Sequence, residues 1–446
     1  MRVAIIGAGI SGLSTAFYLQ RSRSDAQIHI YEANAHAGGT LHTRDLDGFL
    51  FEEGGNGFLS NKPDMLKLVE DCQGLHLLMR SEDASRKRFI YTDAMHAFPD
   101  SPPKFLKSKL LTLPQKLRVA GEFFIPAKKD DVDETLQAFG YRRLGQAFTD
   151  VFLDAMTAGI YGTTADRVSV QAAFPLVTQL ERDHGGLFKG MLARRKKSAG
   201  PGGVLMSFKG GMSRIIEHLQ GQIEATWHLG TSVESITREG AQYVVRTPDS
   251  SVNFDQVITA VPAYCAAPMF QELDPQLSEQ LAALSYSPIA VVGFGWKQLD
   301  HDLDGFGLLT TATAPLPFLG VLWDSSIFPD RAPPGMKSVR IMLGGQRSPE
   351  KLELSDEALI AESRRGLAEA LGITQEPDAT MIKCWPKGLP GYPVGHIKAV
   401  DQIMDRAEQY RGLHITGNAF RGIAMNDCVR NGRATGEKAA FFGRVN

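Results

Sequence analysis

The residues best placed to hold a cofactor stand at the start of the chain, where Gly7-Ala8-Gly9-Ile10-Ser11-Gly12 follows the apolar run of residues 2–6. A helical pattern follows directly, and a second apolar run, residues 27–31, ends at Glu32. A glycine-rich turn between a strand and a helix brings backbone N–H groups and the positive end of the helix to a phosphate. Glu32, twenty positions after Gly12, is placed to accept hydrogen bonds from a ribose hydroxyl. The sequence therefore predicts a βαβ unit that binds a dinucleotide.

A second glycine doublet, Gly38-Gly39, stands shortly after Glu32 and is followed by Thr40. The chain must pass beside the cofactor's phosphates here, where larger side chains would obstruct it. This extension resembles the FAD signature of glutathione-reductase-like and amine-oxidase-like flavoproteins, and it is not expected in dehydrogenases that use NAD alone. The predicted cofactor is therefore FAD, held without a covalent bond. We interpret Cys384, beside Trp385, as an inert buried thiol and not as a point of flavin attachment.

Length and composition exclude several classes of protein. The chain has 446 residues, too many for a single core, and a formal net charge of −2 that gives no sign of a nucleic-acid partner. Its four cysteines are scattered and form no CxxC pair, so we expect no metal site, no disulfide framework and a cytoplasmic location. No apolar run reaches the roughly 18 residues that a membrane-spanning helix needs.

The fold class predicted from these patterns is α/β, with a Rossmann-type FAD domain of the glutathione-reductase-like kind. Strand patterns occur at residues 289–294 and 338–343, and a helical pattern covers residues 426–442. The chain is predicted to divide into an FAD-binding domain (1–63, 205–265 and 400–446), a mixed α/β substrate domain (64–85 and 266–399) and a helical insertion (86–204).

Short blocks that lie outside the glycine turns are spread over nearly the whole chain. They are residues 48–59, 158–162, 172–175, 180–185, 323–329, 342–345, 389–396 and 422–428. Together they resemble the oxygen-dependent protoporphyrinogen and coproporphyrinogen oxidases of haem biosynthesis, within the amine-oxidase-like flavoproteins. The resemblance implies the six-electron oxidation of a porphyrinogen, foremost protoporphyrinogen IX to protoporphyrin IX, with oxygen as acceptor and hydrogen peroxide as product.

Other functions stay open at this point. Coproporphyrinogen III differs from protoporphyrinogen IX only in carrying propionates in place of two vinyl groups, and the residues do not separate the two. An FAD amine or polyamine oxidase is an alternative on the same fold. A non-catalytic carrier of flavin or porphyrin is an alternative from another class of protein.

The resemblance also assigns site residues. It implies that the backbone of Gly159 lies beside the tetrapyrrole. Asn56 departs from the family pattern, because it stands where plant and animal members carry an arginine that anchors a propionate; its amide can still donate one hydrogen bond there. Arg421 and Lys297 are other candidates for that anchor. The late Gly417 is expected by the pyrophosphate, and the start of the following helix by the flavin ring. The predicted cofactor contacts are Gly7, Ala8, Gly9, Ile10, Ser11, Gly12, Glu32, Gly38, Gly39, Thr40, Gly54, Gly55, Asn56, Gly57, Val233, Gly417, Ile423, Ala424 and Met425.

Several residues have a plain structural interpretation. Val233 suits a core strand as well as a cofactor contact, and Asp427 suits a cap on the last helix. The apolar and basic stretch 104–118, with the basic run 194–197, leaves open a peripheral contact with the cytoplasmic face of the membrane. The alternative for this stretch is an amphipathic helix with a solvated face. Whether the protein forms a homodimer is also left open.

Overall fold

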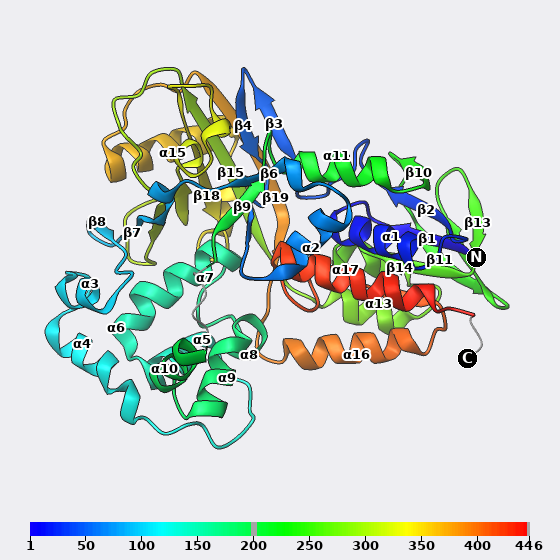
Figure 1. Cartoon of the computed structure of the whole chain (residues 1–446), viewed down its shortest axis with the longest axis horizontal. Helices are drawn as coiled ribbons and strands as arrows, with labels where there is room; N and C mark the ends of the chain where they lie inside the picture. Colours follow the sequence, from blue (N-terminus) through cyan, green and yellow to red (C-terminus); the bar gives the residue numbers. More distant parts are fainter. Residues whose placement is uncertain (198–202, 444–446) are drawn as a thin grey trace.

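The structure is a computed structural model that describes residues 1–197 and 203–443, without the side chains of residues 84, 85 and 195–197. Figure 1 shows a domain built on a parallel sheet at one end of the molecule, which also contains the N-terminus and the last helix. A mixed sheet and a group of helices lie beside each other at the opposite end (Figure 1). We call these three parts the parallel-sheet domain, the mixed-sheet domain and the helical insertion.

The parallel-sheet domain is centred on a five-stranded sheet in the order β10-β2-β1-β14-β20, with every pair parallel. Its strands are β1 (Arg2–Ile6), β2 (Gln27–Glu32), β10 (Ala225–Leu229), β14 (Gln256–Thr259) and β20 (Leu413–Ile415). Val3 and Ile5 enter the core on one face of the sheet, and Ala4 and Ile6 enter the core on the other. Because both faces are covered, the strands read as continuous apolar runs.

Helices cover one face of this sheet, and a small meander with further helices covers the other. The first face carries α1 (Ile10–Ser22), α2 (Pro63–Asp71), α11 (Ser213–Gln222) and α17 (Met425–Ala440). The second face carries the antiparallel strands β11 (Ser235–Glu239), β12 (Gln242–Arg246) and β13 (Ser251–Phe254), with α12 (Ala263–Met269), α13 (Pro275–Ala282) and α16 (His396–Glu408). The helix that the sequence predicts over residues 426–442 is α17.

The mixed-sheet domain contains seven strands in the order β19-β15-β18-β17-β16-β7-β8. They are β7 (Arg88–Tyr91), β8 (Met95–Ala97), β15 (Tyr286–Trp296), β16 (Gly307–Thr310), β17 (Gly320–Leu322), β18 (Lys337–Gly344) and β19 (Ala379–Pro390). Strands β15 and β18 confirm the patterns at 289–294 and 338–343. Helix α15 (Asp356–Leu371) covers one face, where it shares a core with Val292 and Ile341. The other face meets the parallel-sheet domain and the helical insertion.

Two boundaries differ from the sequence prediction. Residues 88–97, expected in the helical insertion, form β7 and β8 at the edge of the mixed sheet, because β7 pairs in parallel with β16, more than 200 positions away. Residues 64–71, expected in the substrate domain, belong to α2, which buries Met65 and Leu68 against the parallel-sheet core. Both errors come from contacts between segments far apart in sequence, which local patterns do not reveal.

Two small sheets and two short helices join the domains. They are the hairpin β3 (Thr43–Leu46) and β4 (Phe49–Glu52), the sheet of β5 (Phe58–Leu59), β9 (Leu205–Phe208) and β6 (Leu78–Arg80), and the helices α14 (Asp324–Ile327) and η5 (Pro329–Arg331). The hairpin lies against β15, where a Cβ added to Gly293 would stand 2.5 Å from the Phe51 ring.

The helical insertion has a core of its own, in which Phe139, Phe152 and Leu180 are buried. Its elements are α3 (Pro102–Lys107), α4 (Leu113–Ala120), η3 (Gly121–Phe124), α5 (Leu136–Arg143), α6 (Gln146–Phe148), η4 (Thr149–Leu153), α7 (Asp154–Tyr161), α8 (Val170–Ala173), α9 (Pro175–His184) and α10 (Leu187–Lys197). Among the helices of the described residues, none combines the length and the apolar character that crossing a bilayer demands.

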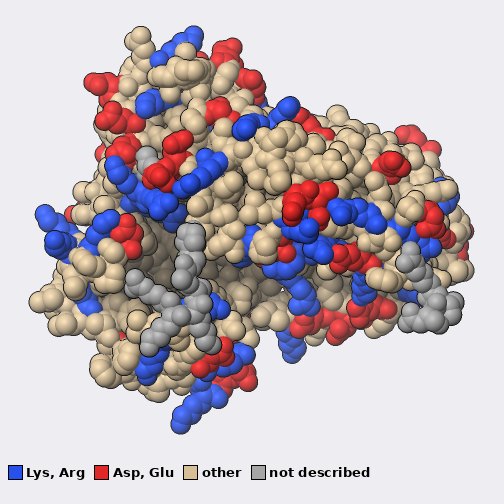
Figure 2. Space-filling model, in the orientation of Figure 1, with Lys and Arg blue, Asp and Glu red and all other residues tan. Residues whose placement is uncertain are grey.

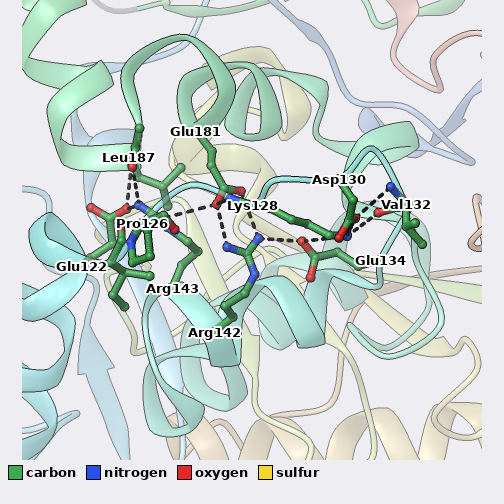
Figure 3. A network of polar contacts seen from close by, with 12 residues as sticks. Glu122, Pro126, Lys128, Asp130, Val132, Glu134, Arg142, Arg143, Glu181 and Leu187 are labelled. Atoms are coloured by element: carbon green, nitrogen blue, oxygen red, sulfur yellow. Dashed lines mark hydrogen bonds and ion pairs between the residues drawn. The ribbon is translucent and has the colours of Figure 1, made fainter.

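A network of buried ion pairs fastens four of these elements (Figure 3). The guanidinium of Arg143, fully buried on α5, pairs with Glu122 on η3 and, at 3.2 Å, with Glu181 on α9. Glu122 also accepts the first two amides of α10, from Leu187 at 2.7 Å and Phe188 at 3.1 Å. Glu122 and Glu181, the buried carboxylates of the network, are both paired, which is the condition for burying charge at an acceptable cost.

Candidate functional site

The two predicted glycine turns lie against each other at the start of α1. Gly9 is the N-cap residue of α1, and the helix has no acidic residue in its first turn. Gly9 forms an isolated bridge with Gly38, whose amide donates to the Ala8 carbonyl at 2.9 Å. A Cβ added to Gly9 would meet nothing nearer than the Gly39 Cα, at 3.9 Å. The turns thus leave a space free of side chains at a helix N-terminus, which suits a pyrophosphate.

Glu32 holds these turns together through hydrogen bonds to backbone amides. Its carboxylate is buried and accepts hydrogen bonds from the Ala8 amide at 2.9 Å and the Asn34 amide at 3.0 Å. An ionised carboxylate has about four lone-pair sites, so a ribose hydroxyl can still be accepted. The sequence predicts the ribose contact, and the structure adds the role of fixing the turn.

The turn of Gly54–Gly57 meets both the second glycine doublet and the last helix. A Cβ on Gly54 would lie 2.3 Å from the Thr40 carbonyl oxygen. A Cβ on Gly55 would lie 3.5 Å from the Met425 methyl carbon. Residues predicted from three segments far apart in sequence are therefore neighbours in space.

The first turn of α17 offers its amides to the same region. Ala424 is the N-cap residue, and among the described residues no side chain caps this helix. Asp427, which the sequence interprets as a cap, instead pairs with Lys62 at 3.3 Å and Arg430 at 2.8 Å, so that interpretation is wrong. The first turn of this 16-residue helix thus contains the Asp427 carboxylate, and because Lys62 and Arg430 pair with that charge, the helix start can still face a group that carries negative charge.

Side chains of the mixed-sheet domain hold three successive carbonyls at the glycine turn. The Arg340 guanidinium donates to the carbonyls of Glu52 and Gly54, both at 2.8 Å. The Trp385 indole N–H donates to the Glu53 carbonyl at 2.8 Å. Sequence reasoning missed both residues; the only signal for Arg340 is a lone charge within an apolar strand.

Asn56 is tied into this arrangement through Asp324. Its amide Nδ2 donates to the Asp324 carboxylate at 3.4 Å, and that carboxylate pairs with Arg340 at 2.9 Å. The Asn56 amide therefore faces an anion of the protein. A propionate at the same N–H group would have to displace this contact with Asp324, whose charge Arg340 compensates.

Gly159 lies on α7 and is exposed, facing the mixed sheet. A Cβ placed on it would stand 2.7 Å from the Leu309 side chain on β16. Leu309 pairs in register with Ile90 on β7, and Ile90 packs in the core of the helical insertion. This face of the sheet is thus the one opposite α15.

Arg88 shares that face, because alternate residues of a strand point to the same side. It stands two positions before Ile90, pairs in register with Gly307, and is exposed. The Arg88 guanidinium carbon lies 5.0 Å from the centroid of the Phe306 ring. Arg88 is a cation at the candidate substrate face that sequence reasoning missed.

The two cations suggested by the sequence lie elsewhere. Ile289, near the start of β15, packs near Trp385. Lys297 follows the other end of the same strand, about 26 Å away along it. Its backbone amide donates to Asp378. Arg421 is 53% exposed and pairs with Asp401 at 2.8 Å. Neither is placed by the structure beside Asn56 or Gly159.

The remaining predicted residues have the following positions. Val233 is buried in the loop before β11 and is not part of a strand. Gly417 follows β20 with a φ of 136° and lies near the Val261 carbonyl.

Burial raises the pKa of the Cys384 thiol, which disfavours the reactive thiolate. Within the described residues, no three His, Cys, Asp or Glu side chains gather as metal ligands. Of the basic run 194–197, the structure describes the side chain of Arg194 alone.

The surface is hollowed where the helical insertion meets the parallel-sheet domain (Figure 2).

The chain matches the family of flavin containing amine oxidoreductases over residues 10–438, and it belongs to that family. A coproporphyrinogen III oxidase of Bacillus subtilis (strain 168) is 28% identical, over 99% of this chain and 98% of its own. The human protoporphyrinogen oxidase is 27% identical, over 97% of this chain and 96% of its own.

Solved structures agree with this assignment. A protein of Exiguobacterium sp. 255-15, provisionally named protoporphyrinogen oxidase, is 26% identical, with a TM-score of 0.88 over 99% of this chain and 98% of its own. A putrescine oxidase structure, 16% identical over 98% and 99% of the two chains with a TM-score of 0.72, shares the fold. The family resemblance and the α/β fold predicted from the sequence are confirmed. The protein is a flavin-dependent oxidoreductase, and members of its family bind FAD.

Proposed function

We propose that this protein is an FAD-dependent oxidase that converts a porphyrinogen into the corresponding porphyrin, with oxygen as acceptor and hydrogen peroxide as product. The observation that carries the proposal is the match along nearly the whole chain to relatives named for porphyrinogen oxidation. Protoporphyrinogen IX is the substrate proposed first. Coproporphyrinogen III is the second candidate, favoured by the relatives from Bacillus subtilis and Staphylococcus aureus that carry its name.

The residues of the chain divide the work between cofactor and substrate. Gly9 and Gly39 leave room for the FAD pyrophosphate, Glu32 accepts from the ribose, and the start of α17 faces the flavin ring. When bound, FAD supplies hydride acceptance followed by reoxidation with oxygen. Gly159 on α7 and Leu309 on β16, which pack against each other, are proposed to line the space for the macrocycle.

Arg88 is proposed to bind a propionate carboxylate of the substrate. Strand register places it on the same sheet face as Leu309. Arg340 and Lys383 share this face, but they pair with Asp324 and Glu53. A guanidinium can bind a carboxylate through two parallel hydrogen bonds, which an amide such as Asn56 cannot do.

The experiment is to add each porphyrinogen to the purified protein in air and to follow porphyrin fluorescence. We expect one substrate to gain fluorescence faster than its autoxidation, with one hydrogen peroxide formed for each pair of electrons removed. A preparation that binds FAD but oxidises neither substrate would contradict the proposal. Under anaerobic conditions, bleaching of the flavin by a porphyrinogen separates an oxidase from a carrier, and bleaching by a polyamine would indicate an amine oxidase.

We further propose that the helical insertion makes peripheral contact with an anionic membrane surface. Large apolar side chains are exposed on it at Leu106, Leu113, Leu117, Phe123, Phe124, Met191 and Leu192. Lys and Arg side chains occur among uncharged residues over this part of the surface (Figure 2). Cosedimentation with anionic vesicles, lost when Leu113 and Leu117 are both changed to Glu, is the expected result; retention by that variant would contradict it.

A further inference from the structure

Tyr392 lies directly after β19, and its ring is buried against the loop that joins β20 to α17. Its hydroxyl donates to the Asn418 carbonyl at 2.6 Å and accepts from the Gly422 amide at 2.9 Å. One hydroxyl thus connects two ends of a five-residue stretch. This loop carries Gly417 and leads into Ile423, both predicted cofactor contacts.

The backbone around Tyr392 is held from the helical insertion. The Tyr392 carbonyl accepts from the Ser169 amide at 2.7 Å. The Asp133 carboxylate accepts from the Ser169 hydroxyl at 2.7 Å and from the Gly395 amide at 3.1 Å. Asp133 and Ser169 therefore fasten the segment 392–395 to the insertion.

The aromatic ring of Tyr392 is fixed by its neighbours. The His396 ring stacks on it, with centroids 4.1 Å apart and an interplanar angle of 18°. The Tyr161 ring, from α7, lies 5.6 Å away. Burial raises the pKa of the Tyr392 hydroxyl well above its usual range, so the hydroxyl keeps the proton that it donates to Asn418.

We propose that Tyr392 is a positioning residue through which the helical insertion fixes the loop that faces the flavin. The residue touches neither substrate nor cofactor in this assignment; it acts by holding the Asn418–Gly422 stretch and, with it, the start of α17. The inference rests on the proposed binding of FAD at the glycine turns. It goes further in linking the insertion physically to the environment of the flavin.

The test compares Tyr392→Phe with Tyr161→Phe. Both tyrosines are buried in the same core, but the Tyr161 hydroxyl donates to the Ala173 carbonyl, at 3.2 Å, inside the helical insertion. The measurements are the FAD dissociation constant, the absorption spectrum of the bound flavin and the midpoint of unfolding. We expect Tyr392→Phe to weaken FAD binding about tenfold and to shift the flavin spectrum, as the loss of two buried hydrogen bonds at the loop would do.

Tyr161→Phe is expected to keep the dissociation constant and the spectrum of the unaltered protein, even where its unfolding midpoint falls. If Tyr392→Phe matches Tyr161→Phe in both flavin measurements, the assignment is overturned. If the unaltered protein binds no FAD, the proposed function fails and not this inference alone.

A second comparison tests the link to the insertion. Asp133→Asn removes the charge that accepts from Gly395 and Ser169, and it should shift the flavin spectrum in the same direction as Tyr392→Phe. In a protein that already carries Tyr392→Phe, the same change should have little further effect. An equal shift in both backgrounds would contradict coupling through Tyr392. The Asp133→Asn variant still tests the proposal if Tyr392→Phe does not fold. An unshifted flavin spectrum in Asp133→Asn would then contradict the proposal.

Discussion

The glycine turns of the parallel-sheet domain and the ion-pair network of the helical insertion hold chain segments together by opposite means. At the turns, Gly9 and Gly39 approach closely because neither has a side chain, and the contacts are made by backbone atoms. In the insertion, Arg143 and Glu122 are fully buried, and charged side chains fasten η3, α5 and α10 (Figure 3).

The difference shows why the two regions respond to change differently. A binding site formed by backbone atoms loses its ligand when a side chain is added, but the fold around the site can remain. A buried ion pair loses stability when one partner is removed, because the other charge stays in a dry environment. Function is therefore expected to be sensitive at the turns, and stability at the network.

The largest effect is expected for Gly9→Val. The added side chain would occupy the space between the turns, so the purified protein should contain no flavin. Absorbance near the flavin bands, relative to protein, measures the outcome. Gly221→Val is the matched control, because a Cβ at Gly221 meets no described atom within 4 Å. A yellow Gly9→Val protein would place the cofactor elsewhere.

A large effect on stability is expected for Arg143→Met. It leaves Glu122 buried without its partner, at a cost of about 3–5 kcal/mol in the free energy of unfolding. Denaturant unfolding followed by tyrosine and tryptophan fluorescence measures this, while folded protein should still bind FAD.

Arg182→Met is the control for the network, since Arg182 is 64% exposed and its carboxylate partner is 3.8 Å away. We expect that variant to change the free energy of unfolding by less than about 1 kcal/mol. If the two variants are equally stable, the contrast between network and surface pairs is incorrect.

The smallest effect is expected for Arg88→Gln, at the sheet face that lies between the two regions. Losing one guanidinium–carboxylate contact should raise the KM for the porphyrinogen about tenfold, with FAD binding unchanged. Steady-state porphyrin fluorescence measures it. Lys297→Gln, at the far end of β15, is the control and should leave the KM as it was; the reverse result would move the carboxylate anchor to Lys297.

The Gly-rich turns, the first βαβ unit and the two long strands of the mixed sheet were predictable because their signals are local. A glycine between a strand and a helix, or a short run of apolar residues, is encoded within about thirty positions. The family blocks, including Asn56 and Gly159, were accessible for the same reason. Asp427 shows the limit: its place in a first helical turn indicates a cap, but Lys62 and Arg430 bind it instead.

What the sequence by itself determined is the type of cofactor turn and the family, because both depend on residues close together along the chain. Only the tertiary structure decided which charges meet the site. Arg88 lies on the same sheet face as Leu309 because β7 pairs with β16, and Arg340 donates to the carbonyls of Glu52 and Gly54 from the neighbouring strand β18. Such contacts join segments more than 200 positions apart, and their register follows from the packing of whole sheets, which no local pattern contains.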